Sequence, residues 1–163
     1  MSKDYFSFDT IRDQDGNIVC YYITVIGTIE QDGVAKVRTD LKSDGSGKMA
    51  FGQITVHNRD RKLYSLLAEN NARIRLHTKD AEDESVDVIS YTASQWRAEE
   101  AFNFVQGDRV LIHGRAYFRK NTRYPSQKAE LSITAMGLFL LGHRRVMRHE
   151  TLSQKMGILP QKD

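Results

Sequence analysis

The chain has 163 residues, 40% of them hydrophobic, with two prolines and a formal net charge of +3, which suits one folded domain and excludes wholesale disorder. Its one cysteine, Cys20, excludes an internal disulfide, the first residues lack a signal core, and the longest apolar run is too short to span a membrane, so we expect a reducing cytoplasm. Basic residues dominate positions 109–148, where Glu130 is the single acid, and this favours a polyanionic partner over charge that serves solubility alone.

Residues 18–30 are rich in β-branched and aromatic side chains and predict the first strand. Gly27 interrupts this run, and a glycine inside a strand allows the bend that the first strand of a small closed barrel needs. Residues 1–17 are polar with scattered aromatic rings, and we interpret them as an N-terminal arm. Residues 34–41 could continue the sheet outward, before a glycine-rich loop that lacks the ending of a phosphate loop.

Residues 49–58 predict the second strand, with Ile54 and Val56 facing inward and Phe51 and His57 facing outward. The stretch that follows, residues 59–83, is long and irregular, and we expect it to form a hairpin extension of the sheet. The candidate nucleic-acid-binding residues near its start are Arg59, Arg61, Lys62 and Tyr64.

Residues 85–92 predict the third strand, with Tyr91 close to its end. Residues 95–105 form the one convincing helix in the middle of the chain, with Ser94 as its expected N-cap. Trp96 lies on the apolar side of this predicted helix. We therefore expect the ring to lie in the core or at an interface rather than to stack on a base.

The fourth predicted strand, residues 107–121, has an unusual polar side. Period-two alternation places Arg115, Tyr117 and Arg119 in one row, with Lys120 next in the chain. Such a row suits a nucleic-acid strand, because guanidinium groups bind phosphates and an aromatic ring stacks on a base. An exposed strand with solubilising arginines and one surface tyrosine is the alternative.

Residues 127–136 predict a fifth strand, with Leu131 and Ile133 inward, and residues 143–163 form a basic tail for which a helix is one interpretation. Three strands, one helix and two strands follow the order of an all-β fold, the five-stranded OB-fold Greek-key barrel with its helix between strands three and four. We expect this domain over residues 18–142, together with the extended hairpin loop.

Four stretches of the chain resemble the bacterial single-stranded DNA-binding proteins. ITVIGTIEQDGVAKVR is similar to the opening strand of that family, and FGQITVHNR is similar to its second strand. VISYTASQWRAEEAFNFVQGDRVLIHGRAYFRKNT resembles the third strand, helix and fourth strand in the same order, and AELSITAMGL fits the last strand. The step GDRVLIHGR followed by RK is the most specific match.

This resemblance implies a bacterial cytoplasmic protein, associated with the nucleoid or a plasmid, that forms a homo-oligomer, a tetramer or a dimer. It implies that the chain binds single-stranded DNA without strong sequence preference and protects it during replication, recombination or repair. The chain departs from the family in two ways. Ser85, the Arg59 to Tyr64 region and Asn121 stand where members often carry tryptophans, and the last residues are basic where members carry an acidic tail. The positions that match the binding face, or lie beside it, are Phe51, His57, Arg59, Arg61, Lys62, Tyr64, Tyr91, Arg115, Tyr117, Arg119 and Lys120.

Two other classes of function remain open from the sequence. A protein-interaction or scaffold module of OB-fold type would show an apolar patch in place of a cationic one, and an RNA-binding protein is a variant of the main interpretation. An enzyme is disfavoured, because the five histidines are scattered without metal-site spacing and no nucleophile signature is present. We accordingly expect no metal, no cofactor and no small-molecule substrate.

Overall fold

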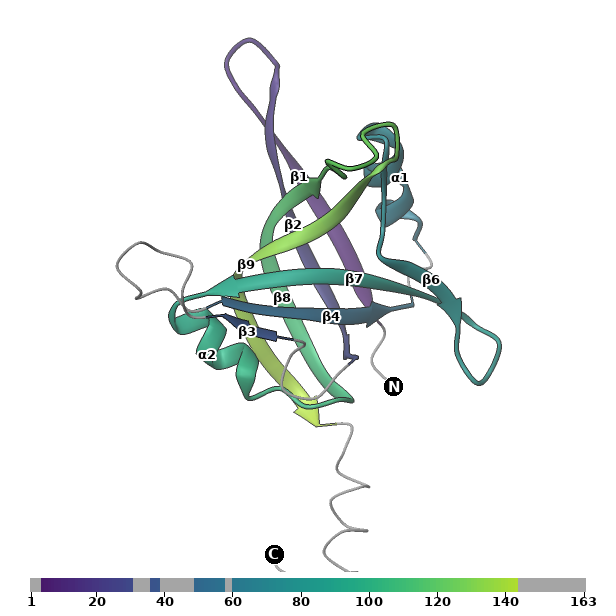
Figure 1. Cartoon of the computed structure of the whole chain (residues 1–163), viewed down its shortest axis with the longest axis vertical. Helices are drawn as coiled ribbons and strands as arrows, with labels where there is room; N and C mark the ends of the chain where they lie inside the picture. Colours follow the sequence, from purple (N-terminus) through teal and green to yellow (C-terminus); the bar gives the residue numbers. More distant parts are fainter. Residues whose placement is uncertain (1–3, 31–35, 39–48, 58–59, 144–163) are drawn as a thin grey trace, which may run out of the picture.

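A computed structural model describes residues 4–30, 36–38, 49–57 and 60–143, which are mostly β-sheet (Figure 1). The sheet combines long strands with several short ones, and two helices accompany it. In chain order the elements are β1 (Tyr5–Arg12), β2 (Ile18–Ile29), β3 (Lys36–Arg38), β4 (Met49–Val56), α1 (Lys62–Glu69), β5 (Ala72–Arg73), β6 (Leu76–Lys79), β7 (Ser85–Ser94), α2 (Trp96–Phe102), β8 (Asp108–Arg119) and β9 (Ala129–His143).

Five of the strands pair in a closed circuit. The order is β2, β8, β9, β7 and β4, and β4 pairs again with the end of β2. The β7–β9 pairing is parallel and the other four are antiparallel. Each of these strands contributes one fully buried isoleucine to the common core: Ile23, Ile54, Ile89, Ile112 and Ile133. Burial of alternate residues from all five strands explains the alternation seen in the sequence.

Two glycines allow strands of this circuit to approach closely. A Cβ built on Gly27 would lie 2.2 Å from the carbonyl oxygen of Thr55, and one built on Gly114 would lie 2.2 Å from the carbonyl oxygen of Thr134. Backbone atoms cannot move out of the way as a flexible side chain can. Both positions therefore exclude a side chain unless the neighbouring backbone shifts.

The predicted N-terminal arm is paired within the chain. β1 runs antiparallel to β2, from Tyr5 opposite Ile26 to Arg12 opposite Ile18. Phe6 is 1% exposed and belongs to the core. The two strands form a hairpin that projects from one end of the molecule (Figure 1).

The interpretation of residues 59–83 as a hairpin extension is wrong, because this stretch contains the helix α1. Leu63, Leu66 and Leu67 follow helical spacing, and all three are buried. After the helix, this stretch contains the short strands β5 and β6. They pair with β9 and β7 respectively.

The second helix, α2, differs from its prediction in two details. Its N-cap is Gln95, without a side-chain capping hydrogen bond, whereas Ser94 belongs to β7. The residues that α2 buries are the small Ala98 and Ala101, and Trp96 is 59% exposed. Of the two places expected for Trp96, the core of this chain is therefore wrong, and an interface stays a prediction.

β9 is longer than the predicted fifth strand, since it continues to His143. The basic tail expected beyond it, from residue 144 on, lies outside the described residues. Within the part of the chain that the structure describes, no helix has the length and apolar character needed to cross a bilayer.

Candidate nucleic-acid interface

The second half of β8 carries the row that the alternation predicts. Arg115, Tyr117 and Arg119 are exposed, with 56% of Tyr117 accessible, and Lys120 follows them, also exposed. Val110 and Ile112, on the other side of the strand, are completely buried. Core packing therefore fixes the direction of the row, because turning the strand over would expose the isoleucine and valine.

The two arginines of the row differ in their surroundings. Arg119 lies 3.3 Å from the carboxylate of Glu130, which also lies 3.5 Å from Arg73. Among the described residues, neither Arg115 nor Tyr117 has an ion pair or a side-chain hydrogen bond. The Arg119 side chain is 61% exposed although that of Glu130 is only 13% exposed, so Arg119 shares its charge but remains accessible to an anion, and Arg115 has no carboxylate to share within the part of the chain that the structure describes.

Strand register extends this surface across three further strands. Arg115 lies opposite Thr134 of β9, Thr134 opposite Thr92 of β7, and Thr92 opposite Phe51 of β4. Directly opposed residues share a face of the sheet, so Phe51 is on the same face as the arginine row. In the neighbouring row, Tyr117 of β8 lies opposite Ser132 of β9, and Ser132 lies opposite Ser90 of β7. We call the whole surface the outer face: Phe51, Ser90, Thr92, Arg115, Tyr117, Arg119, Ser132 and Thr134.

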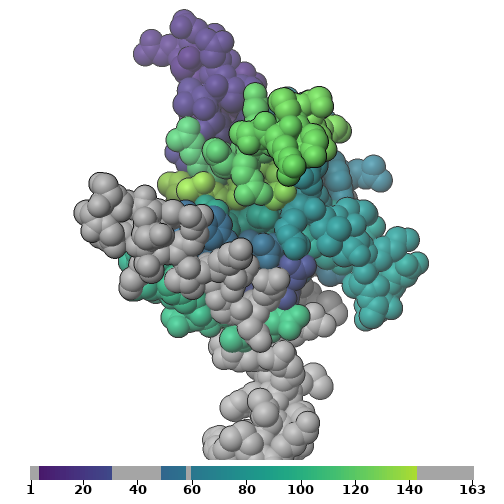
Figure 2. All heavy atoms as spheres, viewed as in Figure 1, coloured from purple at the N-terminus to yellow at the C-terminus, as the bar shows by residue number. Residues whose placement is uncertain are grey.

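The loop between β8 and β9 adds an aromatic ring that the sequence interpretation did not select. Tyr124 is 53% exposed, and the guanidinium of Arg123 lies 5.8 Å from its ring centroid. Asn121 orders this loop, because its side-chain oxygen accepts hydrogen bonds from the backbone N–H groups of residues 123 and 124. Figure 2 shows the loop as a projection at the same end of the molecule as the β1–β2 hairpin. A tyrosine beside an arginine in a basic turn was the signal that could have identified it.

Tyr91 is in the core and not on the outer face, which corrects its assignment to the binding surface. Only 1% of it is exposed, and burial raises the pKa of its hydroxyl. Its strand partner is Gly52, and a Cβ on that glycine would lie 2.5 Å from the tyrosine ring. The missing side chain at Gly52 provides the space in which the ring is packed, so Tyr91 cannot stack on a base.

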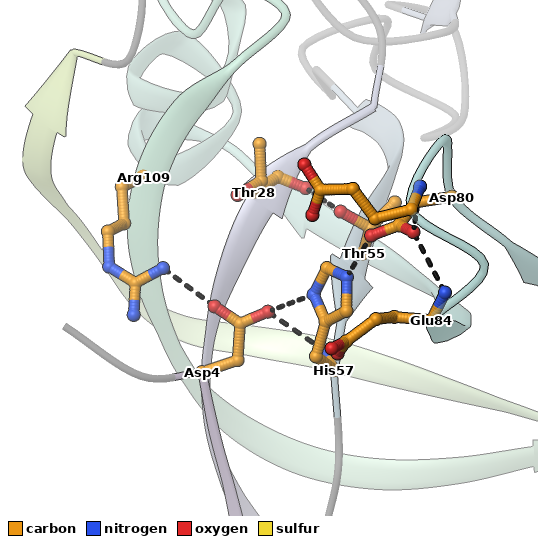
Figure 3. Close-up of polar contacts among 8 residues, drawn as sticks. Asp4, Thr28, Thr55, His57, Asp80, Glu84 and Arg109 are labelled. Atoms are coloured by element: carbon orange, nitrogen blue, oxygen red, sulfur yellow. Dashed lines mark hydrogen bonds and ion pairs between the residues drawn. The ribbon is translucent and has the colours of Figure 1, made fainter. Parts of the chain in front are cut away.

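His57 is held between two acids at the other end of β8 (Figure 3). Its Nδ1 lies 3.1 Å from the carboxylate of Asp4, and its Nε2 lies 2.9 Å from that of Asp80. Asp4 also accepts a hydrogen bond of 2.6 Å from Arg109, at the start of β8. Two carboxylates facing one imidazole suit its protonated form, and the cluster ties the start of β1 to β4, β8 and the β6–β7 turn.

These contacts set the pKa values of the cluster. Burial alone would lower the pKa of His57, but the hydrogen bonds and charges of Asp80 and Asp4 outweigh it and raise this pKa above its ordinary 6.5. The hydrogen bond from His57 in turn lowers the pKa of Asp80. His57 already balances carboxylates, so its assignment to the phosphate-binding surface is not supported by its surroundings.

Replacing His57 with glutamine should cost stability mainly at acid pH. Since the pKa of His57 is raised in the folded state, its stabilising contribution is fully present below pH 6.5 and is lost as the pH rises through the folded-state value. Urea unfolding of both proteins at pH 5.5 and 8.5 measures this. The difference in unfolding free energy between the native chain and His57→Gln should be larger at pH 5.5, and a difference independent of pH would contradict the charged bridge.

The basic start of the long loop lies on and before α1 and is not part of the sheet rows that form the outer face. Arg61 and Lys62 are exposed, whereas Arg59 lies outside the described residues. Tyr64 donates a hydrogen bond to the buried Asp87, whose carboxylate is also 2.7 Å from Nδ1 of His77. Burial and this hydrogen bond raise the pKa of Tyr64. The structure thus brings Arg115, Tyr117 and Arg119 of β8 onto one surface with Phe51, while Lys120 follows directly after β8. His57 and Tyr64 lie in separate clusters.

Within the described ranges, no three histidine, cysteine or acidic side chains come together in a way that could hold a metal ion. The outer face has a different chemistry: exposed Arg115, Tyr117 and Arg119, with Glu130 opposite Arg119, lie beside small hydroxyl groups and the half-buried Phe51. Such a surface can bind phosphates and stack on planar bases.

No protein-family model matches the chain, and no curated protein matches its sequence. The solved structures that match include the small single-stranded DNA-binding protein of Streptomyces coelicolor, at 16% identity and a TM-score of 0.43, over 73% of this chain and 92% of that one. The second single-stranded DNA-binding protein of Mycobacterium smegmatis matches at 14% identity and a TM-score of 0.43, over 74% of this chain and 87% of that one.

The single-stranded DNA-binding protein of Thermus aquaticus matches at 12% identity and a TM-score of 0.46, over 84% of this chain and 56% of that one. The structural neighbours are thus bacterial single-stranded DNA-binding proteins. Because these TM-scores are below 0.5 and the identities are low, the function proposed below depends on this chain's own outer face.

Proposed function

We propose that this chain is a divergent member of the bacterial single-stranded DNA-binding family, with β2, β4, β7, β8 and β9 as its OB-type barrel, and that it binds single-stranded DNA on the outer face. The observation that carries this proposal is the exposed row on β8. Arg115 and Tyr117 have no ion pair or side-chain hydrogen bond among the described residues, and 56% of the Tyr117 ring is exposed. An exposed cation can bind a phosphate, and an exposed ring beside it can stack on a base.

The roles follow from the position of each group. Arg115 and Arg119 bind phosphates, with Lys120 continuing the positive charge toward the β8–β9 loop, and Tyr117 stacks on a base. Ser90, Thr92 and Thr134 have short side chains, which leave room for a strand to cross toward Phe51. Stacking is tolerant of base identity, so binding is without strong sequence preference and suits protection of DNA in replication, recombination or repair.

Fluorescence anisotropy of labelled oligo-dT, the same length of duplex, and oligo-U tests this function. We expect oligo-dT to bind with an affinity that falls steeply with salt, and the duplex to bind more weakly because its bases are not available to Tyr117. Tighter binding of oligo-U would support the RNA-binding variant. The absence of binding to any of them at low salt would refute the nucleic-acid function.

We also propose that the chain forms a homo-oligomer through an apolar row on the same side of β1, β2, β8 and β9. Tyr5 lies opposite Ile26, Ile26 opposite Leu111, and Leu111 opposite Phe139. Tyr5 and Phe139, at the two ends of this row, are 42% and 56% exposed. Four neighbouring apolar side chains on one face form a patch of the kind that marks a protein interface.

Replacing Phe139 with aspartate should dissociate the oligomer, because a charge cannot be buried there without a partner. Light scattering should give a multiple of 18.7 kDa for the native chain and a mass close to 18.7 kDa for the variant. A native chain that is monomeric at high concentration would contradict the homo-oligomer. It would favour the alternative, a scaffold module that presents this row to another protein.

A further inference from the structure

Trp96 is the only tryptophan in the chain, and the core does not use it. It is the first residue of α2, and 59% of it is exposed, more than any other large hydrophobic residue of the described part of the chain. The helix packs through Ala98 and Ala101 instead. Exposing so large a ring is unfavourable unless a partner covers it.

Arg97 holds a fixed position over the indole. Its guanidinium carbon lies 4.5 Å from the Trp96 ring centroid, and its Nε donates a hydrogen bond of 2.7 Å to the backbone carbonyl of Met136. The cation covers part of the ring, and the hydrogen bond prevents the guanidinium from turning away. The indole is therefore held in place with more than half of its surface still exposed.

A β-bulge in β9 explains why the carbonyl of Met136 is available. His113 pairs with Gly137 and Gly114 pairs with Ala135, so Met136 is left without a partner on β8. Met136 is exposed and lies two residues beyond Thr134, about 7 Å along the strand. Thr134 is the direct partner of Arg115. The bulge thus anchors the Trp96–Arg97 pair beside the outer face.

We propose that Trp96, backed by Arg97, is a second base-stacking platform that extends the path of the single strand from the outer face over the bulge in β9 to α2. This inference rests on the proposed function and adds the residue that would stack on a further base. Glu100, exposed on α2, disfavours phosphates near the ring. The contact at Trp96 is therefore through a base, with the phosphates bound on β8.

Intrinsic fluorescence reports on this platform directly, because every photon of tryptophan emission comes from Trp96. Unlabelled oligo-dT of increasing length is titrated into the native protein, while anisotropy of labelled oligo-dT measures binding independently. A single OB fold binds about 4–16 nucleotides. We expect the shortest oligonucleotides to bind without quenching, and oligonucleotides toward the upper end of that range to quench most of the emission at the stoichiometry that anisotropy gives.

A matched pair of variants completes the experiment. Trp96→Leu should weaken the binding of long oligo-dT about fivefold or more with an unchanged salt dependence, and should leave the binding of the shortest oligonucleotides unaffected. Trp96→Phe keeps a ring and should recover most of the affinity. Circular dichroism and thermal unfolding of both variants identify any loss of folding, which is not expected for an exposed side chain.

The outcomes separate this inference from the proposed function. Binding by anisotropy without quenching at any length, and with full affinity in Trp96→Leu, would overturn the platform and leave the outer-face function intact. No binding at all would overturn both. Emission that shifts on dilution of the protein alone, with a change of mass in Trp96→Leu, would show that a second copy of the chain covers the ring, and this too would overturn the platform.

Discussion

Replacing Arg115 and Arg119 together with alanine will weaken the binding of oligo-dT and flatten its dependence on salt. Each phosphate contact with a single strand contributes about 0.7 to the slope of log affinity against log salt, so the loss of two contacts should reduce the slope by up to about 1.4. Arg119 shares its charge with Glu130, at 3.3 Å, whereas Arg115 has no such partner among the described residues. The single variant Arg115→Ala should therefore account for most of the change.

A matched control is Arg75→Ala. Arg75 is also exposed, but it pairs with Glu30 at 3.3 Å and lies between β5 and β6, so it is not one of the outer-face residues. Anisotropy titrations at several salt concentrations should give a native slope for this control and a shallower slope for the double variant. Parallel lines for the double variant and the native chain would show that the two arginines do not bind phosphates.

Replacing Tyr117 with alanine should reduce affinity without changing the salt slope. The ring is 56% exposed and does not belong to the buried core, so its loss removes a base contact and no charge. Stacking of one base contributes about 1–3 kcal/mol, which corresponds to a loss of affinity of about fivefold to somewhat more than a hundredfold.

Two variants make this result interpretable. Tyr117→Phe keeps the ring and should bind almost as tightly as the native chain, while Tyr124→Ala removes the exposed ring of the β8–β9 loop and shows whether stacking extends to that loop. If Tyr117→Ala and Tyr117→Phe lost affinity equally, the hydroxyl and not the ring would make the contact. If neither lost any, the base-stacking role would be contradicted.

The faces of the long strands could be predicted from the sequence because burial imposes a period of two on them. Ile54 and Val56 on β4, Ile112 on β8 and Ile133 on β9 are all fully buried, as the alternation indicates. The same rule placed Arg115 and Tyr117 on the exposed side of β8. A local pattern was sufficient there, because each of these strands has one side against the core and the other side free.

The errors arose where distant partners decide the outcome. α1 was missed because the polar residues between Leu63 and Leu67 obscured the helical spacing, and helices of eight residues depend on packing more than on propensity. Tyr91 is buried because Gly52, 39 positions earlier by residue number, leaves space for its ring. His57 contacts Asp4, 53 residues away, and no local pattern predicts that a carboxylate balances the imidazole.

The bulge in β9 could not be predicted from the sequence either. It depends on the register between β8 and β9, where Met136 is passed over between two consecutive pairings. The carbonyl of Met136 accepts the hydrogen bond that holds Arg97 over the exposed Trp96, and the sequence pattern shows none of these contacts. Composition and spacing could therefore identify the charged row, but they could not show how far the surface beside it extends.

Photocrosslinking tests most directly whether single-stranded DNA lies on the outer face. The native protein is irradiated in complex with oligo-dT that carries 5-iododeoxyuridine, and the modified peptides are mapped by mass spectrometry with unlabelled duplex as competitor. We expect the main adduct on Tyr117, resistant to the duplex and lost in 1 M salt, where charge contacts are screened. Adducts confined to α1 or to the β6–β7 turn, with none on β8, would contradict the proposed binding surface.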